Sequence, residues 1–322
     1  MTWLDGVGRR LGGTPEIVAR TPLTGGYASG VVERVDLLVD GRVHTVVLKP
    51  ADPVEVAAMR AVAVVDPELV AVPRMLATDP LVLEFVDGAA DGEVREPVLR
   101  TLAAVHRHWF RKRPRGLPVV DASWWRGLCA HVLVALRGAA ERAVVAPGDP
   151  DAAGSSAAPA GGSAAPAGGS AAPAGRSAAP SGARTAPEPW PTAIAQVTAW
   201  AEDPRIVAAL ALLPKTLCHG DAHRGNMLGD HLIDWGNARV APAGLDLAVI
   251  EAQGAVDLGP YRVLFPEGPL AEVEREWARV HAHVQYLGFA ADHLGAARVA
   301  EMLDTAAEAL ARLGPALTAA PR

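Results

Sequence analysis

The sequence predicts an α+β protein of two lobes, in which a small antiparallel sheet precedes a larger and mainly helical part. Valine-rich segments with partly alternating apolar positions fill residues 15–49. From residue 93 onward the apolar residues mostly recur at helical spacing. A polar motif in residues 217–239 interrupts the helical part. A chain of 322 residues is long enough to build a sizeable core in two such lobes.

Three strands are predicted in residues 16–23, 31–39 and 43–49, joined as an antiparallel meander with a turn at Asp40-Gly41. A glycine-rich loop, residues 25–30, separates the first two strands. Its exposed amides, including those of Gly26 and Ser29, could close over phosphate groups. An ordinary hairpin turn explains the same residues equally well.

Lys49 ends the third strand and is one of only three lysines in the chain. A cation at the end of an apolar strand needs either solvent or an anion, and a nucleotide phosphate would supply that anion. Glu55 follows in the first turn of a helix predicted to begin after Asp52. Glu55 therefore either pairs with Lys49 or caps its own helix. The sequence leaves both interpretations open.

A buried strand is predicted from Leu81 towards Gly88, where it closes in a glycine turn. Such a turn can act as a hinge, and backbone groups of Glu84 and Val86 could bond the edge of an adenine. We therefore expect residues 1–88 to form a nucleotide-binding lobe that ends in this hinge. Residues 89–146 and 189–322 would form the helical lobe.

Residues 147–188 differ in composition from the rest of the chain. The unit SAAPAGG at Ser156 recurs at Ser163, and more loosely at Ser170 and Ser177. A proline in every unit and the lack of large apolar side chains argue against a coiled coil. We expect a disordered insert of Ser, Ala, Pro and Gly, because lengthening a loop costs only about 0.6 kcal/mol per doubling.

Bulk composition excludes several classes of function. A formal charge of −6 without a basic stripe argues against a nucleic-acid partner. The two cysteines, Cys129 and Cys218, are far apart, which suggests neither a disulfide framework nor a structural zinc site. The chain has no window of 18 apolar residues free of Pro, Gly and charge, and no secretory signal. We expect a cytoplasmic protein with no membrane partner.

The motif in residues 217–239 places three oxygen-bearing side chains close together in the chain: Asp221, Asn226 and Asp234. Gly229-Asp230 is typical of a two-residue type II′ hairpin turn between short apolar arms. Such a hairpin sets Asn226 opposite Ile233, so Asn226 and Asp234 emerge together at its open end. An amide oxygen and a carboxylate in this position can share Mg²⁺.

This arrangement favours phosphoryl transfer, which depends on alignment and on neutralising charge. Asp221 would orient an attacking alcohol and accept its proton, Asn226 and Asp234 would hold magnesium, and Lys49 would fix the phosphates. His219 would brace the loop by hydrogen bonding.

Two other classes of function compete with this interpretation. His219, Asp221 and His223 could instead be ligands of a metal-dependent hydrolase. That hypothesis leaves Asn226 and Lys49 without a purpose. A non-catalytic nucleotide-binding module is the other alternative.

The motifs HGDAHRGNML and LIDWGNA resemble those of the aminoglycoside phosphotransferase and choline kinase group of small-molecule kinases. The similarity extends to LKP at Lys49, VPRMLATDPLVLEFVDG, LAAVH ending at His106, and GLDLAVI containing Asp246. The resemblance implies a bilobal protein-kinase-like fold with ATP between the lobes near Glu84 and Val86. Asp246 would brace the catalytic loop from below.

The resemblance further implies ATP, with GTP as an alternative, and Mg²⁺ as cofactors, in a monomer or homodimer. The acceptor would be a small-molecule alcohol, most plausibly an antibiotic or related secondary metabolite, with a primary metabolite such as an amino alcohol or sugar as the alternative. Members of the group hold the acceptor among their C-terminal helices. The candidates there are Gln253, Asp257 and Tyr261.

Overall fold

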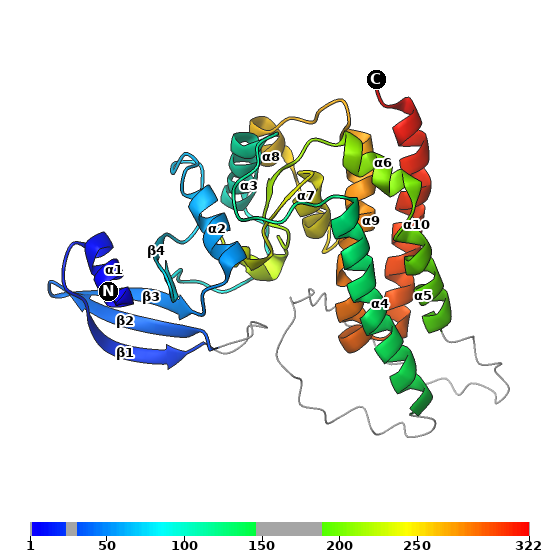
Figure 1. Cartoon of the computed structure of the whole chain (residues 1–322). Coiled ribbons are helices and arrows are strands. Elements are labelled where there is room, and N and C mark those ends of the chain that lie inside the picture. The colour runs from blue at the N-terminus through cyan, green and yellow to red at the C-terminus, as the bar shows by residue number, and fades with distance from the viewer. Residues whose placement is uncertain (1, 24–30, 146–188, 322) are drawn as a thin grey trace, which may run out of the picture.

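The computed structural model describes residues 2–23, 31–145 and 189–321. The predictions for Gly26 and Ser29, and for the insert over residues 147–188, therefore lie outside the described residues. The α+β architecture is confirmed, with one sheet at the N-terminal end of the molecule and helices over most of the remainder (Figure 1).

The N-terminal sheet has five strands in the order β1-β2-β3-β5-β4, and every neighbouring pair is antiparallel. The predicted meander is confirmed, because Val39 pairs with Arg42 across the turn at Asp40 and Gly41. Both turn residues have positive φ, 48° and 77°, as a type I′ turn requires. The strands are β1 (Glu16–Pro22), β2 (Glu33–Val39), β3 (Arg42–Lys49), β4 (Met75–Thr78) and β5 (Leu81–Glu84).

The sequence analysis did not foresee helix α1 (Trp3–Leu11) or strand β4. A reciprocal capping box starts α1, in which Thr2 and Asp5 each bond the other's backbone amide. The helix packs on the sheet and completes a small core. That core comprises Val7, Val35, Leu37, Val39, Val46, Leu76 and Val82.

Helix α2 (Pro53–Val62) links the sheet to the helical part of the molecule. Its N-cap is Asp52, whose side chain accepts from the amides of Val54 and Glu55 at 2.7 and 2.9 Å. The buried face of α2 shares a hydrophobic cluster with α3 (Glu96–Trp109) and with the motif segment. This packing brings the end of β3 near the motif, where Lys49 forms the ion pairs described below.

The largest core lies between helices at the C-terminal end, where α4, α5, α9 and α10 run side by side (Figure 1). None of the helices in residues 2–23, 31–145 and 189–321 is long and apolar enough to cross a membrane. The helices of this region are α4 (Ala122–Val145), α5 (Pro189–Trp200), α6 (Pro204–Leu212), α9 (Ala271–Phe289) and α10 (Ala296–Ala319), with a π-helical turn over Ala290–Leu294.

The motif segment lies between these two ends of the molecule. Strands β6 (Thr216–Cys218) and β9 (Arg239–Ala241) pair antiparallel and enclose it. Between them lies the hairpin β7 (Met227–Leu228) and β8 (His231–Leu232), flanked by single 3₁₀ turns over Arg224–Asn226 and Trp235–Asn237. Helices α7 (Gly244–Glu251) and α8 (Gly259–Leu264) follow.

Candidate active site

The hairpin has the predicted register. Met227 pairs with Leu232, and the amide of Ile233 donates to the carbonyl of Asn226 at 2.9 Å. Gly229 has φ of 55° and Asp230 is not among the residues of positive φ, which is the pattern of a type II′ turn. Asn226 and the residue after Ile233, Asp234, therefore leave the open end of one short hairpin.

Asp221 is only 3% exposed, and both of its carboxylate oxygens accept hydrogen bonds. Asn237 Nδ2 donates to Oδ2 at 3.0 Å, and the hydroxyl of Tyr286 donates to Oδ1. The Nδ2 group of Asn226 donates to the backbone carbonyl of Asp221 at 2.9 Å. The orientation of this carboxylate is therefore set by residues from two distant elements, the turn after Asp234 and helix α9.

His219 and Asp246 support the loop that carries Asp221. Asp246 is fully buried, and its carboxylate accepts from the amides of His219 and Gly220, both at 2.8 Å. His219 Nε2 lies 2.8 Å from the carbonyl of Ile233, while its Nδ1 accepts from the amide of Asp221 at 3.3 Å. His219 thus ties the loop to the hairpin.

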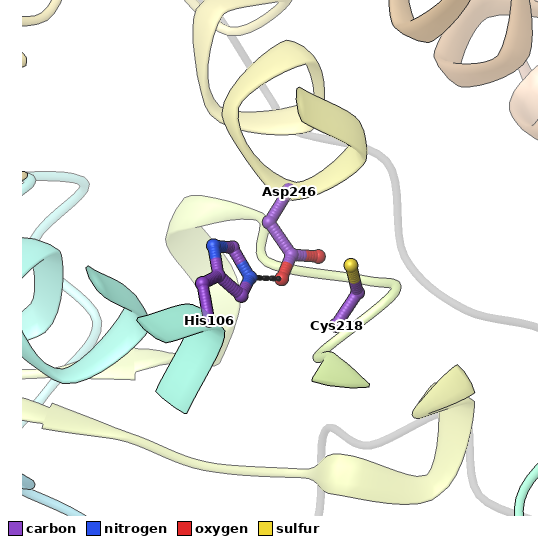
Figure 2. A group of neighbouring side chains, drawn as sticks. All are labelled: His106, Cys218 and Asp246. Carbon is purple, nitrogen blue, oxygen red and sulfur yellow. Dashed lines mark hydrogen bonds and ion pairs between the residues drawn. The ribbon is translucent and has the colours of Figure 1, made fainter. Parts of the chain in front are cut away.

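Asp246 also accepts from His106 Nε2 at 3.0 Å (Figure 2). Burial alone would raise the pKa of Asp246, but the hydrogen bond and charge of His106, with the amide of Gly220, lower it below its ordinary value. The same figure shows Cys218 beside this pair. The potential ligand atoms of the three side chains lie within 4.8 Å of one another, close enough to share a metal ion. Burial raises the pKa of Cys218 well above its usual value, and its thiol faces the carbonyls of Ala241 and Pro242. The cluster therefore serves as internal support.

The geometry gives little support to the metal-hydrolase alternative. Both ring nitrogens of His219 already bond the backbone. His223 Nδ1 accepts from the amide of Gly225 at 3.0 Å, and its Nε2 lies 3.9 Å from Asp221 Oδ2. Burial lowers the pKa of His223, so its ring stays neutral. These two histidines act as local braces.

Lys49 joins the sheet to both the helix α2 and the hairpin. Its Nζ lies 2.6 Å from Glu55 Oε1 and 3.3 Å from Asp234 Oδ1. Both contacts are ion pairs, and the one with Glu55 is the shorter. Burial would lower the pKa of Lys49, but the two carboxylates outweigh it and raise that pKa. Glu55 is thus a partner of Lys49, while Asp52 alone caps the helix.

Asp234 and Asn226 suit a hard divalent cation. Asp234 occupies the left-handed region, at φ 61° and ψ 66°, and its side chain is 55% exposed. The Nδ2 group of Asn226 donates to the carbonyl of Asp221, while its Oδ1 receives no hydrogen bond from the described residues. A carboxylate and an amide oxygen are the donor types that Mg²⁺ prefers. The donor chemistry therefore fits the ion that the sequence led us to expect.

The proposed hinge is altered in one respect. The amide of Glu84 donates to the carbonyl of Arg74 at 2.9 Å and so extends the pairing of β4 with β5. The carboxylate of Glu84 also pairs with the guanidinium of Arg74, at 2.7 Å. The expectation of a base-binding edge therefore narrows to the carbonyl of Glu84 and the amide of Val86.

The three candidate acceptor residues are engaged in local contacts. Gln253 accepts from the amide of Arg224 at 2.8 Å, and Asp257 accepts from the amide of Gly259 at 2.8 Å. Tyr261 is buried with its hydroxyl 2.8 Å from His106 Nδ1. The structure does not bring them against Asp221.

Sequence reasoning missed four residues around Asp221: Asn237, Arg239, Gln285 and Tyr286. Arg239 and Gln285 donate to the carbonyl of Gly220 at 3.1 and 2.9 Å. Gly220 has φ of 80°, and a Cβ there would lie 2.2 Å from the carbonyl oxygen of Asn237. Asn237 directly follows the Asp-Trp-Gly motif, which was a usable signal. Gln285 and Tyr286 lie 65 positions after Gly220 and Asp221, and no local pattern in the sequence marks them.

Residues 26–283 of the chain match the family described as the phosphotransferase enzyme family. No curated protein matches the chain significantly. A Thermobifida fusca protein provisionally assigned as a fructosamine-3-kinase superposes with a TM-score of 0.52 at 20% identity, covering 96% of this chain and 98% of its own.

Two further solved structures are similar at lower scores. A choline/ethanolamine kinase family protein from Mesorhizobium loti has a TM-score of 0.46 at 13% identity, over 93% of this chain and 91% of its own. Aminoglycoside phosphotransferase APH(3'')-Id from Streptomyces rimosus has a TM-score of 0.40 at 16% identity, over 92% of each chain. The similarity to the Thermobifida fusca structure shows a shared fold across nearly the whole length of both chains.

Proposed function

Because the chain belongs to the phosphotransferase enzyme family, we propose that it moves the γ-phosphoryl group of ATP, or of GTP, to a hydroxyl of a small molecule. Membership also confirms the resemblance drawn from the motifs, the bilobal protein-kinase-like fold and the prediction of an enzyme. The observation that carries the proposal is the position of Lys49, which contacts Glu55 of α2 and Asp234 of the hairpin at once. Sheet, helix and motif thereby meet at one point.

Lys49 would bind the nucleotide phosphates, and Glu55 would hold its ammonium group in place. A lysine kept charged at this junction supplies a fixed positive charge without the cost of reorganising solvent. Asn226 and Asp234 would hold Mg²⁺. That ion, when bound, would neutralise charge that develops on the phosphate oxygens.

Asp221 would orient the acceptor's hydroxyl and take its proton. Its carboxylate is buried and fixed at both oxygens, so little freedom has to be lost when the acceptor binds. His219 and Asp246 would keep the backbone of this loop in place through their bonds to it. Removing Asp221 should therefore act on the transfer step and leave nucleotide binding intact.

For the acceptor we propose a hydroxylated antibiotic or related secondary metabolite, on the strength of the motif resemblance. A primary metabolite such as a sugar or an amino alcohol is the second candidate. The assignment of the Thermobifida fusca relative as a fructosamine-3-kinase motivates the inclusion of amino sugars in that second class.

A screen for ADP release tests the proposal. Purified protein with Mg·ATP would be offered hydroxylated antibiotics, amino alcohols and sugars, and each active acceptor would be retested with Asp221→Ala. We expect one chemical class to release ADP with the wild type, and the variant to bind ATP without turnover. Absence of turnover with every acceptor, or equal turnover by the variant, would refute the proposal.

A further inference from the structure

We propose that Tyr286 of α9 is a positioning residue for Asp221, whose carboxylate it holds in the orientation that receives the acceptor's hydroxyl. The inference rests on the proposed function and adds to it a residue outside the motif segment. Tyr286 lies 65 positions after Asp221, and its hydroxyl donates a hydrogen bond to Oδ1 of Asp221. The contact joins two parts of the chain that the fold alone brings together.

Within the described part of the chain, two side chains donate to the carboxylate of Asp221, and they bind different oxygens. Tyr286 donates to Oδ1, while Asn237 donates to Oδ2 at 3.0 Å. A carboxylate free to rotate about its Cβ–Cγ bond presents its lone pairs in many directions, and bonds to both oxygens stop that rotation. Each oxygen can accept more than one hydrogen bond, so an acceptor's hydroxyl can still bind. The pair of donors therefore fixes where that hydroxyl must lie.

Helix α9 is fastened to the catalytic loop next to Tyr286. Gln285 Nε2 donates to the carbonyl of Gly220 at 2.9 Å, one residue before Asp221. Arg239 Nη2 donates to the same carbonyl at 3.1 Å. Consecutive residues of α9 thus bind consecutive residues of the loop. Gln285 fixes the backbone of the loop and Tyr286 fixes the side chain of Asp221, so the position of Tyr286 relative to Asp221 is determined.

Tyr286 keeps its proton throughout the reaction. Burial, followed by the negative charge of Asp221, raises the pKa of its hydroxyl well above the usual value. In the transfer step the acceptor oxygen bonds to the γ-phosphorus, the bond from that phosphorus to the bridging oxygen breaks, and the acceptor's proton passes to Asp221. Tyr286 donates to Oδ1 of Asp221 while that group is a carboxylate and after it has become a carboxylic acid, so it is a fixed support and does not exchange a proton.

A double-mutant cycle between Tyr286→Phe and Asp221→Asn tests the inference, with ADP release and thermal unfolding as readouts. We expect Tyr286→Phe to lower kcat about 10- to 100-fold, the size of a hydrogen bond to a charged group, with KM for ATP unchanged. In the Asp221→Asn background the same change should have almost no further effect on kcat. The control is Thr101→Val, which removes another buried hydroxyl, one that accepts from the amide of Ala71.

The outcomes separate the inference from the proposed function. If Tyr286→Phe lowers kcat no more than Thr101→Val does, or if its loss simply adds to that of Asp221→Asn, Tyr286 has only a structural role and the inference is wrong. A wild-type protein that is inactive with every acceptor would refute the proposed function, and the inference with it.

Discussion

At the scale of single residues, Lys49 places a mostly buried ammonium group between two carboxylates, those of Glu55 and Asp234. Its side chain is 15% exposed, and that of Glu55 is 3% exposed. Such a pair contributes little over an apolar substitute, but breaking it leaves one charge without a full partner. Substitution of either Glu55 or Lys49 alone is therefore expected to lower the stability of the fold strongly.

Glu55→Gln is expected to lower the free energy of unfolding by about 1–3 kcal/mol and to weaken ATP binding, since Lys49 loses its nearest counter-charge. Denaturant unfolding and nucleotide titration measure the two effects. Glu96→Gln is the matched control, because Glu96 forms an exposed pair with Arg100 at 3.4 Å. It should change stability by about 0.5 kcal/mol or less. Equal effects of both variants would contradict the role of Glu55.

Asp234→Ala is expected to abolish the magnesium dependence of nucleotide binding, because it removes the carboxylate proposed to hold the ion. Asp230→Ala is the control, since Asp230 lies at the exposed tip of the same hairpin and pairs with the guanidinium of Arg95, at 3.8 Å. Calorimetric titration of ATP with and without Mg²⁺ distinguishes them. Unchanged Mg·ATP affinity in Asp234→Ala would exclude Asp234 as a ligand.

The residues of the motif could be found from sequence because they are close in the chain and differ in chemistry from their neighbours. Asp221, Asn226 and Asp234 met that condition. Tyr286 did not, because its role depends on the packing of α9 against the loop, and helical spacing alone describes it as one more aromatic residue of an amphipathic helix.

At the scale of elements, the hairpin is what gives the motif its geometry. Gly229 has φ of 55°, a conformation that costs an L-residue about 1–2 kcal/mol. Gly229→Ala is therefore expected to destabilise the protein by roughly that amount and to weaken Mg·ATP binding, as Asn226 and Asp234 leave the open end of the hairpin.

Gly127→Ala is the matched control for the hairpin, because Gly127 lies on the exposed side of α4 with no atom near the added Cβ. This change should stabilise the helix by about 0.5–1 kcal/mol and leave nucleotide binding unaltered. Unfolding curves and Mg·ATP titrations of the two variants provide the comparison. Intact Mg·ATP affinity in Gly229→Ala would show that the hairpin is not needed to place the ligands.

Elements with a strong local signal were predictable. Strand β2, which precedes Asp40-Gly41, alternates in burial, and α2 carries a cap and a proline at its start. Helix α1 was missed because Gly6 and Gly8 lower its helix propensity, although its capping box was readable. Strand β4 was missed because it has only four residues and a register shift against β5.

At the scale of the whole molecule, α9 connects the C-terminal helical core to the loop that carries Asp221. His281 lies on α9 with its ring stacked on Trp124, at 5.1 Å between centroids, and neither ring nitrogen has a hydrogen-bond partner in the described part of the chain. Burial, and then the charge of Arg239, lower its pKa well below the ordinary value. Burial also lowers the pKa of His283 to about 4.

These two histidines make the fold sensitive to acid. Both are neutral when folded, and their ordinary pKa is 6.5. Below that value the unfolded chain binds protons that the folded chain does not, so the stability that these neutral rings contribute is complete above pH 6.5 and declines as the pH falls below it, towards about 4 for His283. Unfolding free energy should therefore decline over this window.

His281→Phe is expected to reduce this decline and to leave stability equal or higher at neutral pH, because an apolar ring replaces unpaired buried nitrogens. Denaturant unfolding at pH values on both sides of the window provides the measurement. The exposed His131 gives the control His131→Phe, which should keep the wild-type pH dependence. An identical decline in His281→Phe and wild type would contradict this account.

The general architecture was predictable because strand-like periodicity dominates before the hinge and helical periodicity dominates after it. The contact of α9 with the catalytic loop was not, since long-range helix packing leaves no local signal. That contact, in which Gln285 bonds to Gly220, is what places Tyr286 against Asp221.

The central claim is that the γ-phosphoryl group passes to a hydroxyl that Asp221 holds. The most direct test follows labelled γ-phosphate from ATP in the presence of an acceptor found by the ADP screen, with wild type and Asp221→Asn. We expect the label in the acceptor with the wild type, and transfer to the acceptor that falls to a small residual rate with the variant, without a gain of label in inorganic phosphate. Label that appears only in inorganic phosphate, or that reaches the acceptor equally with Asp221→Asn, would contradict the claim.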